Sequence, residues 1–476
     1  MPSLSPPPSD SAEPEDPGAA LHGFVTELFP HRRCITGDGL RQSLLAIGER
    51  VPLRITEVPT GTHVLDWTIP KEWRVREAYL ATEDGTRIVD WADSPLHLVQ
   101  YSVAARDRMP LWALRGHLHT LPDQPDLVPY RTSYYDQTWG FCLSHNALEA
   151  LAENVGEGGD VEVVVDAEHV EGSLTYGEVV VHGETDDEIL LSAHACHPAL
   201  ANDNASSMAV AATLARRLLD GPTPRHTVRF LFAPGTIGAI AWLDRNQATL
   251  GRIRHGLVLA NLGDAGGFTY KRSRRGTLDA PLAVDRAVEV ILRDLGHEVD
   301  VRPFTPTGYD ERQFGSPGFD LPVGRLTRTP HGEYPQYHTC GDDLDLVRPE
   351  ALAASLDALE AVVRTLDGDG RFRNLQPYGE PQLGRRGLYA SLGGLPNGPA
   401  AQQAAVWVLN LSDGRHSLLD VAERSGLPFA AVRAAADRLV EADLLTEALV
   451  VDHPAAEWTT GDGAHAAASA PTPEHR

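Results

Sequence analysis

The spacing of apolar residues divides the chain into segments of different periodicity. Apolar positions three and four apart predict helices over LHGFVTELFP (21–30) and GLRQSLLAIGERV (39–51). From residue 52 to 130 the pattern changes to short β-branched and aromatic runs broken by Gly, Pro and Asp. Such runs are typical of short strands, so residues 52–130 are predicted to form a small β-rich domain inserted into a larger one.

From about residue 131 onward, apolar runs of strand length alternate with amphipathic stretches of helix length. The runs predict strands at 161–170, 175–183, 188–194, 227–234 and 255–264. The stretches predict helices at 206–219, 239–246 and 283–296, and one more that begins near Pro349. This alternation implies an α/β fold with a mostly parallel sheet sandwiched by helices, and ligand sites in such sheets lie at the carboxyl ends of the strands.

The last part of the chain has a helical pattern of its own. Helices are predicted over QQAAVWVLNL (402–411), SLLDVAERSG (417–426) and PFAAVRAAADRLVEADLL (428–445), followed by a short strand. This order and spacing suit a winged helix-turn-helix domain.

The sequence therefore predicts a chain of several parts. The tails are rich in Pro, Ser, Asp and Glu or in Ala, and we expect them to be disordered because they can bury little apolar surface. The predicted parts are disordered tails at 1–18 and 456–476, an α/β domain at 19–51 and 131–374, an inserted domain at 52–130, a linker at 375–400 and a winged helix at 401–455.

Composition and charge narrow the functional classes. Hydrophobic residues make up 42% and charged residues 22% of the 476 residues, as in an ordinary soluble globular protein. No apolar run approaches the roughly 20 residues that span a bilayer, and the acidic N-terminus does not resemble a signal peptide, so a cytoplasmic location is expected. The net charge of −25 disfavours nucleic acid as a partner. Four dispersed cysteines suggest reduced thiols rather than disulfides.

One short segment, SAHACHPALANDNASS (192–207), holds the densest group of candidate metal ligands. His194 ends an apolar strand, and Asp203 follows nine residues later, just before a predicted helix. A neutral imidazole and a carboxylate are a good pair of ligands for zinc. Either residue alone would be interpreted as a strand-end histidine or a helix cap, but their combination favours a metal site.

Two further segments offer ligands of the same kinds. In YHTCGDDLD (337–345), His338 precedes Asp342, Asp343 and Asp345, which alone would indicate an acidic loop before a helix. In NLGDAGG (261–267), Asp264 ends another predicted strand. Strand ends of one α/β domain meet at the same edge, which predicts a single metal site. Its candidate ligands are His194, Asp203, Asp264 and His338.

These motifs resemble those of the co-catalytic zinc aminopeptidases related to bacterial leucyl aminopeptidases. In that family a strand-end His, a bridging Asp, a Glu-Glu pair, a strand-end Asp and a late His hold two zinc ions. Four other phrases resemble a branch of aminopeptidase-like proteins that carries an inserted β domain and a C-terminal winged helix. They are VPTGTHVLDWTIPKEW (58–73), FTYKRSRRG (268–276), DERQFGSPGFDLPVG (310–324) and LNLSDGRHSLLDVAERSG (409–426).

The resemblance implies that His194, Asp203 and Asp264 hold one zinc and that His338 belongs to the second metal position. The chain departs from the family at one place, where Gly235-Thr236 replaces the Glu-Glu pair. The first Glu of that pair is the family's general base and the second is a zinc ligand. We therefore expect one zinc rather than two, and a general base from elsewhere in the chain.

Candidates for the base are Glu311, Glu333 and Asp310, and Asp310 alternatively orients a zinc-bound histidine. A plain surface salt bridge is the alternative for each. The KRSRRG segment (271–276) is the one dense basic run of the sequence, which favours a carboxylate-bearing substrate unless it is merely a solvated loop. Candidate substrate contacts are Lys271, Arg272, Arg275, Arg312 and Tyr337, with Arg325 adjacent. Cys196 is interpreted as a packed thiol, not a nucleophile.

The sequence thus predicts a zinc-dependent aminopeptidase-like hydrolase that cleaves a small peptide or an aminoacyl amide with metal-activated water. The alternatives are a catalytically reduced, metal- or ligand-binding regulatory protein whose winged helix contacts protein or DNA, and a peptide-binding module. The helix predicted at 428–445 mixes Arg433 and Arg438 with three acidic residues and lacks the positive face of a groove reader. Protein contact, including formation of a homo-oligomer through this domain or the insert, is the interpretation we prefer, and sub-micromolar binding to random duplex DNA at low salt would contradict it.

Overall fold

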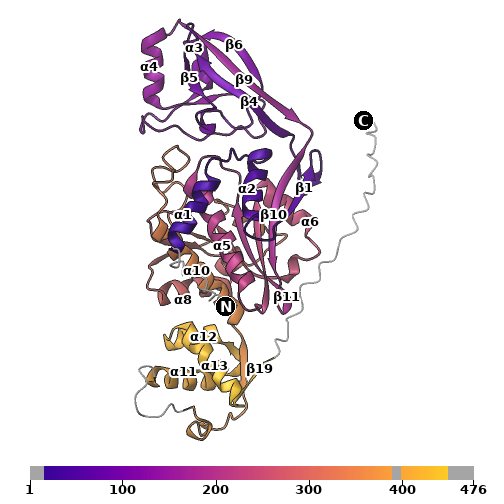
Figure 1. Cartoon of the computed structure of the whole chain (residues 1–476). Helices are drawn as coiled ribbons and strands as arrows, with labels where there is room; N and C mark the ends of the chain where they lie inside the picture. Colours follow the sequence, from indigo (N-terminus) through magenta and orange to yellow (C-terminus); the bar gives the residue numbers. More distant parts are fainter. Residues whose placement is uncertain (1–15, 389–397, 449–476) are drawn as a thin grey trace, which may run out of the picture. The chain divides into compact units, whose positions relative to one another are not determined.

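The structure, a computed structural model, describes residues 16–388 and 398–448 of the chain (Figure 1). Contacts divide the chain into two compact units, one of residues up to Asp369 together with Leu418–Ala434, the other of Gly370–Ser417 and the residues from Ala435 onward. Within the described ranges, every helix is too short or too polar to cross a membrane.

An eight-stranded sheet forms the centre of the first unit, with the order β1-β10-β12-β11-β13-β16-β14-β15. The central strands β12, β11, β13 and β16 are parallel, and the strands toward both edges add antiparallel pairs, so the sheet is mixed. The strands are β1 (Arg54–Pro59), β10 (Ser173–Val181), β11 (Thr185–His194), β12 (His226–Ala233), β13 (Ile253–Leu259), β14 (Phe268–Lys271), β15 (Val299–Arg302) and β16 (Val323–Thr327).

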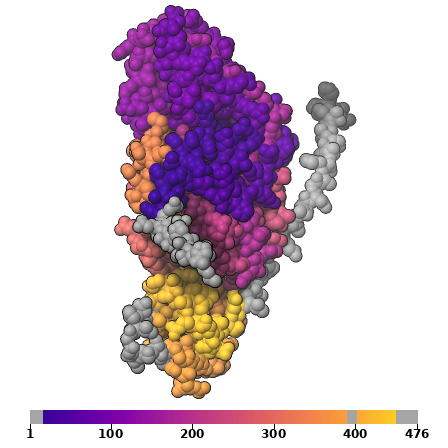
Figure 2. All heavy atoms as spheres, in the orientation of Figure 1, coloured from indigo at the N-terminus to yellow at the C-terminus, as the bar shows by residue number. Residues whose placement is uncertain are grey.

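Helices cover both faces of this sheet. A side chain at Gly177 of β10 would meet Leu44 of α2, whereas the neighbouring Glu178 accepts a hydrogen bond from the indole of Trp242 in α6. Successive residues of a strand point to opposite faces, so α2 and α6 lie on opposite sides. In Figure 2 the indigo N-terminal segment with α1 and α2 faces the viewer. The helices are α1 (Pro17–Leu28), α2 (Asp38–Gly48), α5 (Ser207–Asp220), α6 (Ile237–Arg245), α7 (Arg274–Leu278), α8 (Ala283–Asp294), α9 (Glu311–Phe314) and α10 (Pro349–Gly368).

The central strands are apolar along most of their length because both of their faces are covered. β11 is buried from Glu188 to His194, and the five residues before its last, 189–193, are all hydrophobic or small, as expected of a strand covered on both faces. The carboxylate of Glu188 is buried too, and the guanidinium of Arg229 neutralises it at 2.7 Å. The core therefore holds β11 rigidly up to its last residue.

A second sheet, with the order β5-β4-β9-β6, forms the insert. The structure corrects its expected limits of 52–130 at both ends, because β1 pairs with β10 in the large sheet and β9 pairs with β4 and β6. Periodicity identifies these segments as strands but cannot identify their partners. The elements are β2 (His63–Val64), β3 (Trp67–Thr68), β4 (Glu72–Ala81), β5 (Arg87–Asp90), β6 (Ala105–Pro110), α3 (Leu111–Leu114), β7 (Leu118–His119), β8 (Phe141–Cys142), α4 (His145–Val155) and β9 (Asp160–Val170).

The second unit contains a three-stranded antiparallel sheet with the order β18-β17-β19 and the helix α11. Its strand β17 begins at Arg371, so this domain starts well before the expected residue 401. The elements of the C-terminal region are β17 (Arg371–Asn374), α11 (Gly398–Leu411), β18 (Asp413–Ser417), α12 (Leu418–Ser425), α13 (Phe429–Glu441) and β19 (Leu445–Glu447). Of the expected tails and linker, residues 1–15, 389–397 and 449–476 lie outside the described residues, and α1 already begins at Pro17.

Candidate metal centre

His194 stands at the carboxyl end of the central strand β11. Its register partner is Ala233, the last residue of β12, and β13 ends beside it at Leu259, so three parallel strands end together. The ring is almost fully buried, and its Nε2 lies 2.8 Å from Oδ1 of Asp203. The side-chain amide of Asn204 contacts Nδ1 and the His194 carbonyl, each at 3.2 Å, which fixes the orientation of the ring.

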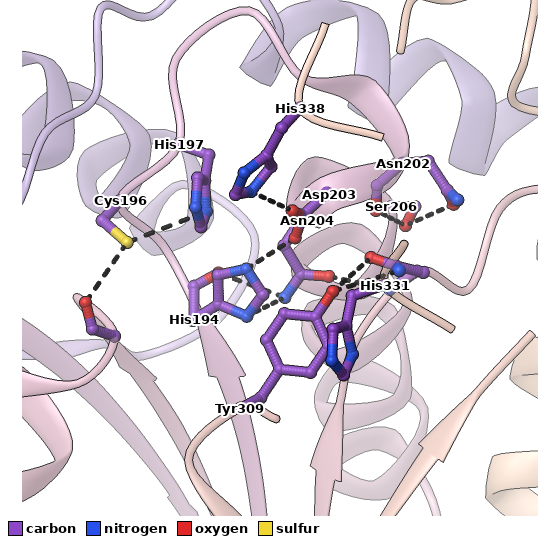
Figure 3. Close-up of polar contacts among 12 residues, drawn as sticks. His194, Cys196, His197, Asn202, Asp203, Asn204, Ser206, Tyr309, His331 and His338 are labelled. Atoms are coloured by element: carbon purple, nitrogen blue, oxygen red, sulfur yellow. Dashed lines mark hydrogen bonds and ion pairs between the residues drawn. The ribbon is translucent and has the colours of Figure 1, made fainter. Parts of the chain in front are cut away.

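Asp203 lies in the irregular turn Ala201–Ser206 that leads into α5. Its carboxylate is completely buried, and Oδ2 lies 3.2 Å from Nε2 of His338. Burial alone would raise the pKa of Asp203, but His197 and His194 hold that pKa well below the usual value of a carboxyl group. The carboxylate is therefore charged, and three imidazoles surround it (Figure 3).

His197 belongs to the same group, although the sequence analysis did not assign it as a ligand. One ligand atom each from His194, His197 and Asp203 lie within 4.8 Å of one another. Burial lowers the pKa of His197 to about 3, so its imidazole is neutral, which is the form that binds a metal. Its place in the HACHP motif, three residues after His194, was a signal that could have identified it.

Two atoms of the group lack the hydrogen bonds that buried polar atoms need. Oδ2 of Asp203 and Nε2 of His338 face each other without hydrogen-bond geometry, and neither has another partner. Leaving such atoms unsatisfied costs about 1–3 kcal/mol each, and more for a charged group. A divalent cation would satisfy both, and imidazole nitrogens with a carboxylate oxygen are a set of ligands that suits zinc.

Neighbouring residues hold both the backbone and the ring of His338 in place. The residue has a positive φ of 54°, and its carbonyl accepts a hydrogen bond of 2.8 Å from the backbone N–H of Tyr130. The ring of Tyr337 stacks on His338 with a centroid separation of 3.9 Å, and Tyr130 meets it edge-on at 4.9 Å. Tyr337, expected to contact the substrate, thus adjoins the centre, and Tyr130 is a contributor that the sequence analysis missed.

Asp342 holds the turn that presents Asp203. Its two carboxylate oxygens accept hydrogen bonds from the backbone N–H groups of Asn202 at 2.6 Å and Asp203 at 3.1 Å, and Oδ2 also accepts from the hydroxyl of Tyr334 at 3.1 Å. Burial, followed by the charge of Asp203, raises the pKa of Asp342 to about 7. The sequence showed a cluster of carboxylates here but not which of them faces inward.

Replacing Asp342 with asparagine should weaken zinc binding by about 10–100-fold, the usual effect of losing an outer partner of a metal ligand. The amide nitrogen cannot accept a backbone N–H, so one hydrogen bond to the turn is lost. Zinc affinity measured by competition with a chromogenic chelator checks this result. Asp345→Asn, a change at an exposed position nearby, is the matched control and should leave the affinity unchanged. Equal affinities for both variants would contradict the role of Asp342.

The structure does not bring Asp264 into the group. β13 ends at Leu259, five residues before Asp264. Both carboxylate oxygens accept other hydrogen bonds, from the side-chain amide of Asn202 at 3.0 Å, the backbone of Gly266 at 2.8 Å and the hydroxyl and backbone of Thr329. Both oxygens of Asp264 are thus engaged with the loop around Asn202, outside the group of His194, His197 and Asp203, and the strand before it is shorter than its apolar pattern indicated.

Asp310 lies beside Gly235, one of the two residues that stand where the resemblance implies a Glu-Glu pair. A Cβ atom built on Gly235 would lie 3.4 Å from the Cβ of His194 and 3.6 Å from both carboxylate oxygens of Asp310. Asp310 is buried, and its Oδ1 has no hydrogen-bond partner. Burial raises the pKa of Asp310 to about 7. A carboxylate from a distant part of the sequence thus lies in contact distance of Gly235.

The other two candidates for the base lie elsewhere. Glu333 is on the surface, where Arg302 pairs with it at 2.9 Å. Glu311 is buried but is bound to Lys271 at 2.9 Å. Glu333 therefore does not belong to the group around His338, although it precedes His338 by only five residues.

Of the four basic residues expected to contact the substrate, Lys271 is buried and the other three are at least partly exposed. Arg272 pairs with Glu289 at 2.7 Å, Arg275 is exposed, and Arg312 is half-buried with an unpartnered Nε. Tyr309 and His331 were not predicted, yet Tyr309 stacks on His194 at 4.9 Å and His331 adjoins Tyr309 at 5.2 Å (Figure 3). No motif in the sequence distinguished these two residues.

Comparison with known proteins agrees with this architecture. Residues 22–369 match the family described as a domain of unknown function (DUF4910), and residues 370–447 match a winged helix-turn-helix family. A Clostridium acetobutylicum protein, provisionally named a polysaccharide biosynthesis protein with an aminopeptidase-like domain, is 43% identical over 428 residues, which cover 90% of this chain and 96% of the relative. A crystal structure from the same organism, provisionally named a peptidase, is 41% identical with a TM-score of 0.83 and coverage of 90% and 96%.

A more distant structure extends the likeness to the fold of a zinc enzyme. BSAP, a zinc aminopeptidase from Bacillus subtilis, is 15% identical with a TM-score of 0.53, and the match covers 74% of this chain and 95% of that protein. At this identity the likeness concerns the fold alone. The expected fold class, an α/β fold of the zinc exopeptidase type with a C-terminal winged helix, is confirmed.

Proposed function

The chain belongs to the family described as a domain of unknown function (DUF4910), and we propose that it is a zinc-dependent hydrolase that cleaves a peptide or amide bond. The observation that carries the proposal is the group formed by the buried His194 and Asp203 with the half-buried His338, in which two buried ligand atoms have no hydrogen-bond partner. The names of the two Clostridium relatives, one with an aminopeptidase-like domain and one a peptidase, support the same class of reaction.

We assign the zinc to His194, Asp203 and His338, with His197 as a further candidate ligand. Three protein ligands leave one position open, as in catalytic zinc sites. The family's second zinc needs a glutamate where this chain has Thr236, so one ion is proposed. Zinc, when bound, acidifies water and polarises a carbonyl group.

Asp310 is the proposed general base. Its unpartnered Oδ1 lies in the space beside His194 and Gly235, where a proton from the attacking water can be accepted. The same oxygen can return the proton to the departing amine. The rings of Tyr130 and Tyr337 both contact the ring of His338 and hold it in place.

The proposed substrates are small peptides and aminoacyl amides. The polysaccharide-related name of one relative adds amide-bearing sugars to the classes worth testing. For the winged helix we propose contact with protein, since α13 carries Arg438 together with Asp437 and Glu441 and so has no uniformly positive face.

The test is metal analysis of the purified full-length chain, followed by a screen of dipeptides, aminoacyl amides and N-acyl amino sugars. We expect about one zinc per chain, hydrolysis of at least one class, and loss of turnover with a chelator that zinc restores. A folded chain that neither holds zinc as purified nor takes it up would refute the proposal.

A further inference from the structure

Two buried cations lie opposite each other on neighbouring strands. Lys271 of β14 and Arg325 of β16 are register partners in an antiparallel pair, so their side chains lie on the same face of the sheet. Each residue is only 3% exposed. Like charges directly opposite each other destabilise a sheet, and burying them without partners costs several kcal/mol per ion. Negative charges must therefore compensate the pair.

Glu311 provides one such charge. Its Oε1 lies 2.9 Å from Nζ of Lys271 and 3.5 Å from Nη1 of Arg325. Within residues 16–388 and 398–448, no other carboxylate forms an ion pair with either cation. Gly308 closes the loop over the cluster, and a Cβ there would lie 2.5 Å from Glu311 Oε1, so this loop residue has no room for a side chain. One positive charge is left without a counterion.

The uncompensated charge resides on Arg325. Lys271 is well satisfied, since Nζ also donates to the carbonyl of Thr307 at 2.5 Å. The guanidinium of Arg325, in contrast, has a buried Nε with no partner, and its Nη1 contacts, to Glu311 at 3.5 Å and to His331 at 3.4 Å, are at the limit of hydrogen bonding. Arg325 is thus a buried cation whose Nε–H has no acceptor and whose Nη1 has only weak ones.

Arg325 adjoins the metal centre through one aromatic ring. Its Cζ lies 5.4 Å from the ring centroid of Tyr309, and Tyr309 stacks on His194 at 4.9 Å. His331 touches both Arg325 and Tyr309, and burial lowers the pKa of its imidazole, so it adds no further positive charge. Arg325 contacts Tyr309, and Tyr309 contacts His194, so one ring separates the cation from a proposed zinc ligand.

We propose that Arg325 receives a carboxylate of the substrate, which makes the enzyme a hydrolase of short peptides or N-acyl amino acids. This inference rests on the proposed function. A guanidinium can bind both oxygens of a carboxylate, an arrangement that a lysine cannot offer. An extended chain advances about 3.3–3.6 Å per residue, so the acidic group lies within two or three residues of the cleaved bond. Arg325 thereby takes the role of binding a substrate carboxylate, which the sequence favoured for Lys271, Arg272 and Arg275.

Hydrolysis of matched substrates tests the inference. Alanylglycine and alanylglycinamide differ only in the terminal carboxylate, and we expect kcat/KM to favour the acid by about 10–100-fold, as for a hydrogen bond to a charged group. In Arg325→Gln this preference should disappear through a higher KM for the acid. Arg325→Lys keeps the charge and should fold, with part of the preference lost. Arg272→Gln, at an outward-facing ion pair, is the control and should behave as the wild type. Equal turnover of acid and amide by the wild type would overturn the inference.

Binding separates this inference from the proposed function. Calorimetry with N-acetylglycine and N-acetylglycinamide on the full-length protein as purified needs no turnover. Tighter binding of the acid in the wild type but not in Arg325→Gln supports the receptor even if no substrate is hydrolysed, in which case only the proposed function fails. Tighter binding of the acid that persists in Arg325→Gln places the carboxylate elsewhere and overturns the inference.

Discussion

Asp203→Asn should yield a folded protein that holds no zinc and shows no hydrolysis. Asp203 provides the one carboxylate among the four candidate ligands His194, His197, Asp203 and His338. It contacts His194 at 2.8 Å and His338 at 3.2 Å. An amide carries no charge to offset that of the cation. Zinc affinity should fall by more than roughly 100-fold, because losing an outer partner alone costs about 10–100-fold. Zinc content by mass spectrometry and the circular dichroism spectrum measure the two outcomes independently.

Asp264→Asn is the informative companion to this variant. Asp264 accepts hydrogen bonds from Asn202, Gly266 and Thr329, so its replacement should lower stability by about 1–3 kcal/mol and leave the zinc content unchanged. Thermal unfolding measures the first effect. If Asp264→Asn emptied the site while Asp203→Asn kept its zinc, the assignment of ligands made from the geometry would be reversed.

Asp310→Asn should lower kcat by about 10²–10⁴-fold while the zinc content stays at the wild-type level. The asparagine has the same size and fits the space beside Gly235, but it cannot accept a proton. Glu333→Gln is the matched control, since Glu333 pairs with Arg302 at the surface, and its kcat should change less than about 2-fold. Full activity of Asp310→Asn would exclude Asp310 as the base.

The pH profile gives a second readout for Asp310. A base acts in its ionised form, so kcat/KM should fall as the pH drops through the pKa of this carboxyl group. Burial raises that pKa to about 7 in the metal-free chain, and a nearby cation lowers it, so the acid limb of the zinc-loaded enzyme should lie below about pH 7. The limb should be absent from the residual activity of Asp310→Asn, and a limb that persists unchanged belongs to another group.

Strand ends, helix starts and buried strands could be predicted from the sequence, because each depends on residues that are neighbours in the chain. The apolar run ending at His194 and the helix start after Asp203 indicated a strand end and a turn, and the structure places the two side chains 2.8 Å apart. His338 could be added because its motif stands beside a carboxylate cluster. The central parallel strands were found because strands buried on both faces are apolar along their length.

Other features depend on contacts that no local pattern contains. β9 has the same strand periodicity as its neighbours, yet it pairs with β4 and β6 in the insert. Glu333 stands five residues from His338 but faces solvent, whereas Asp310 reaches the space beside Gly235 from a loop 75 positions later in the chain. Tertiary packing decides which side chain lies beside Gly235. The apolar run before Asp264 also extended beyond the last strand residue, Leu259, so the end of the strand was misplaced.

The backbone N–H of Tyr130 donates a hydrogen bond to the carbonyl of His338. Zinc binding is therefore thermodynamically linked to the contact between the segment around Tyr130 and the segment around His338. His338 presents its ring with a positive φ, and the segment that ends at Tyr130 holds that backbone in place. A ligand that binds only the assembled arrangement stabilises it, and the effect is reciprocal. Zinc loading therefore also strengthens the attachment of the segment around Tyr130, and any molecule that loosens this segment from His338 lowers the affinity for zinc by the same free energy.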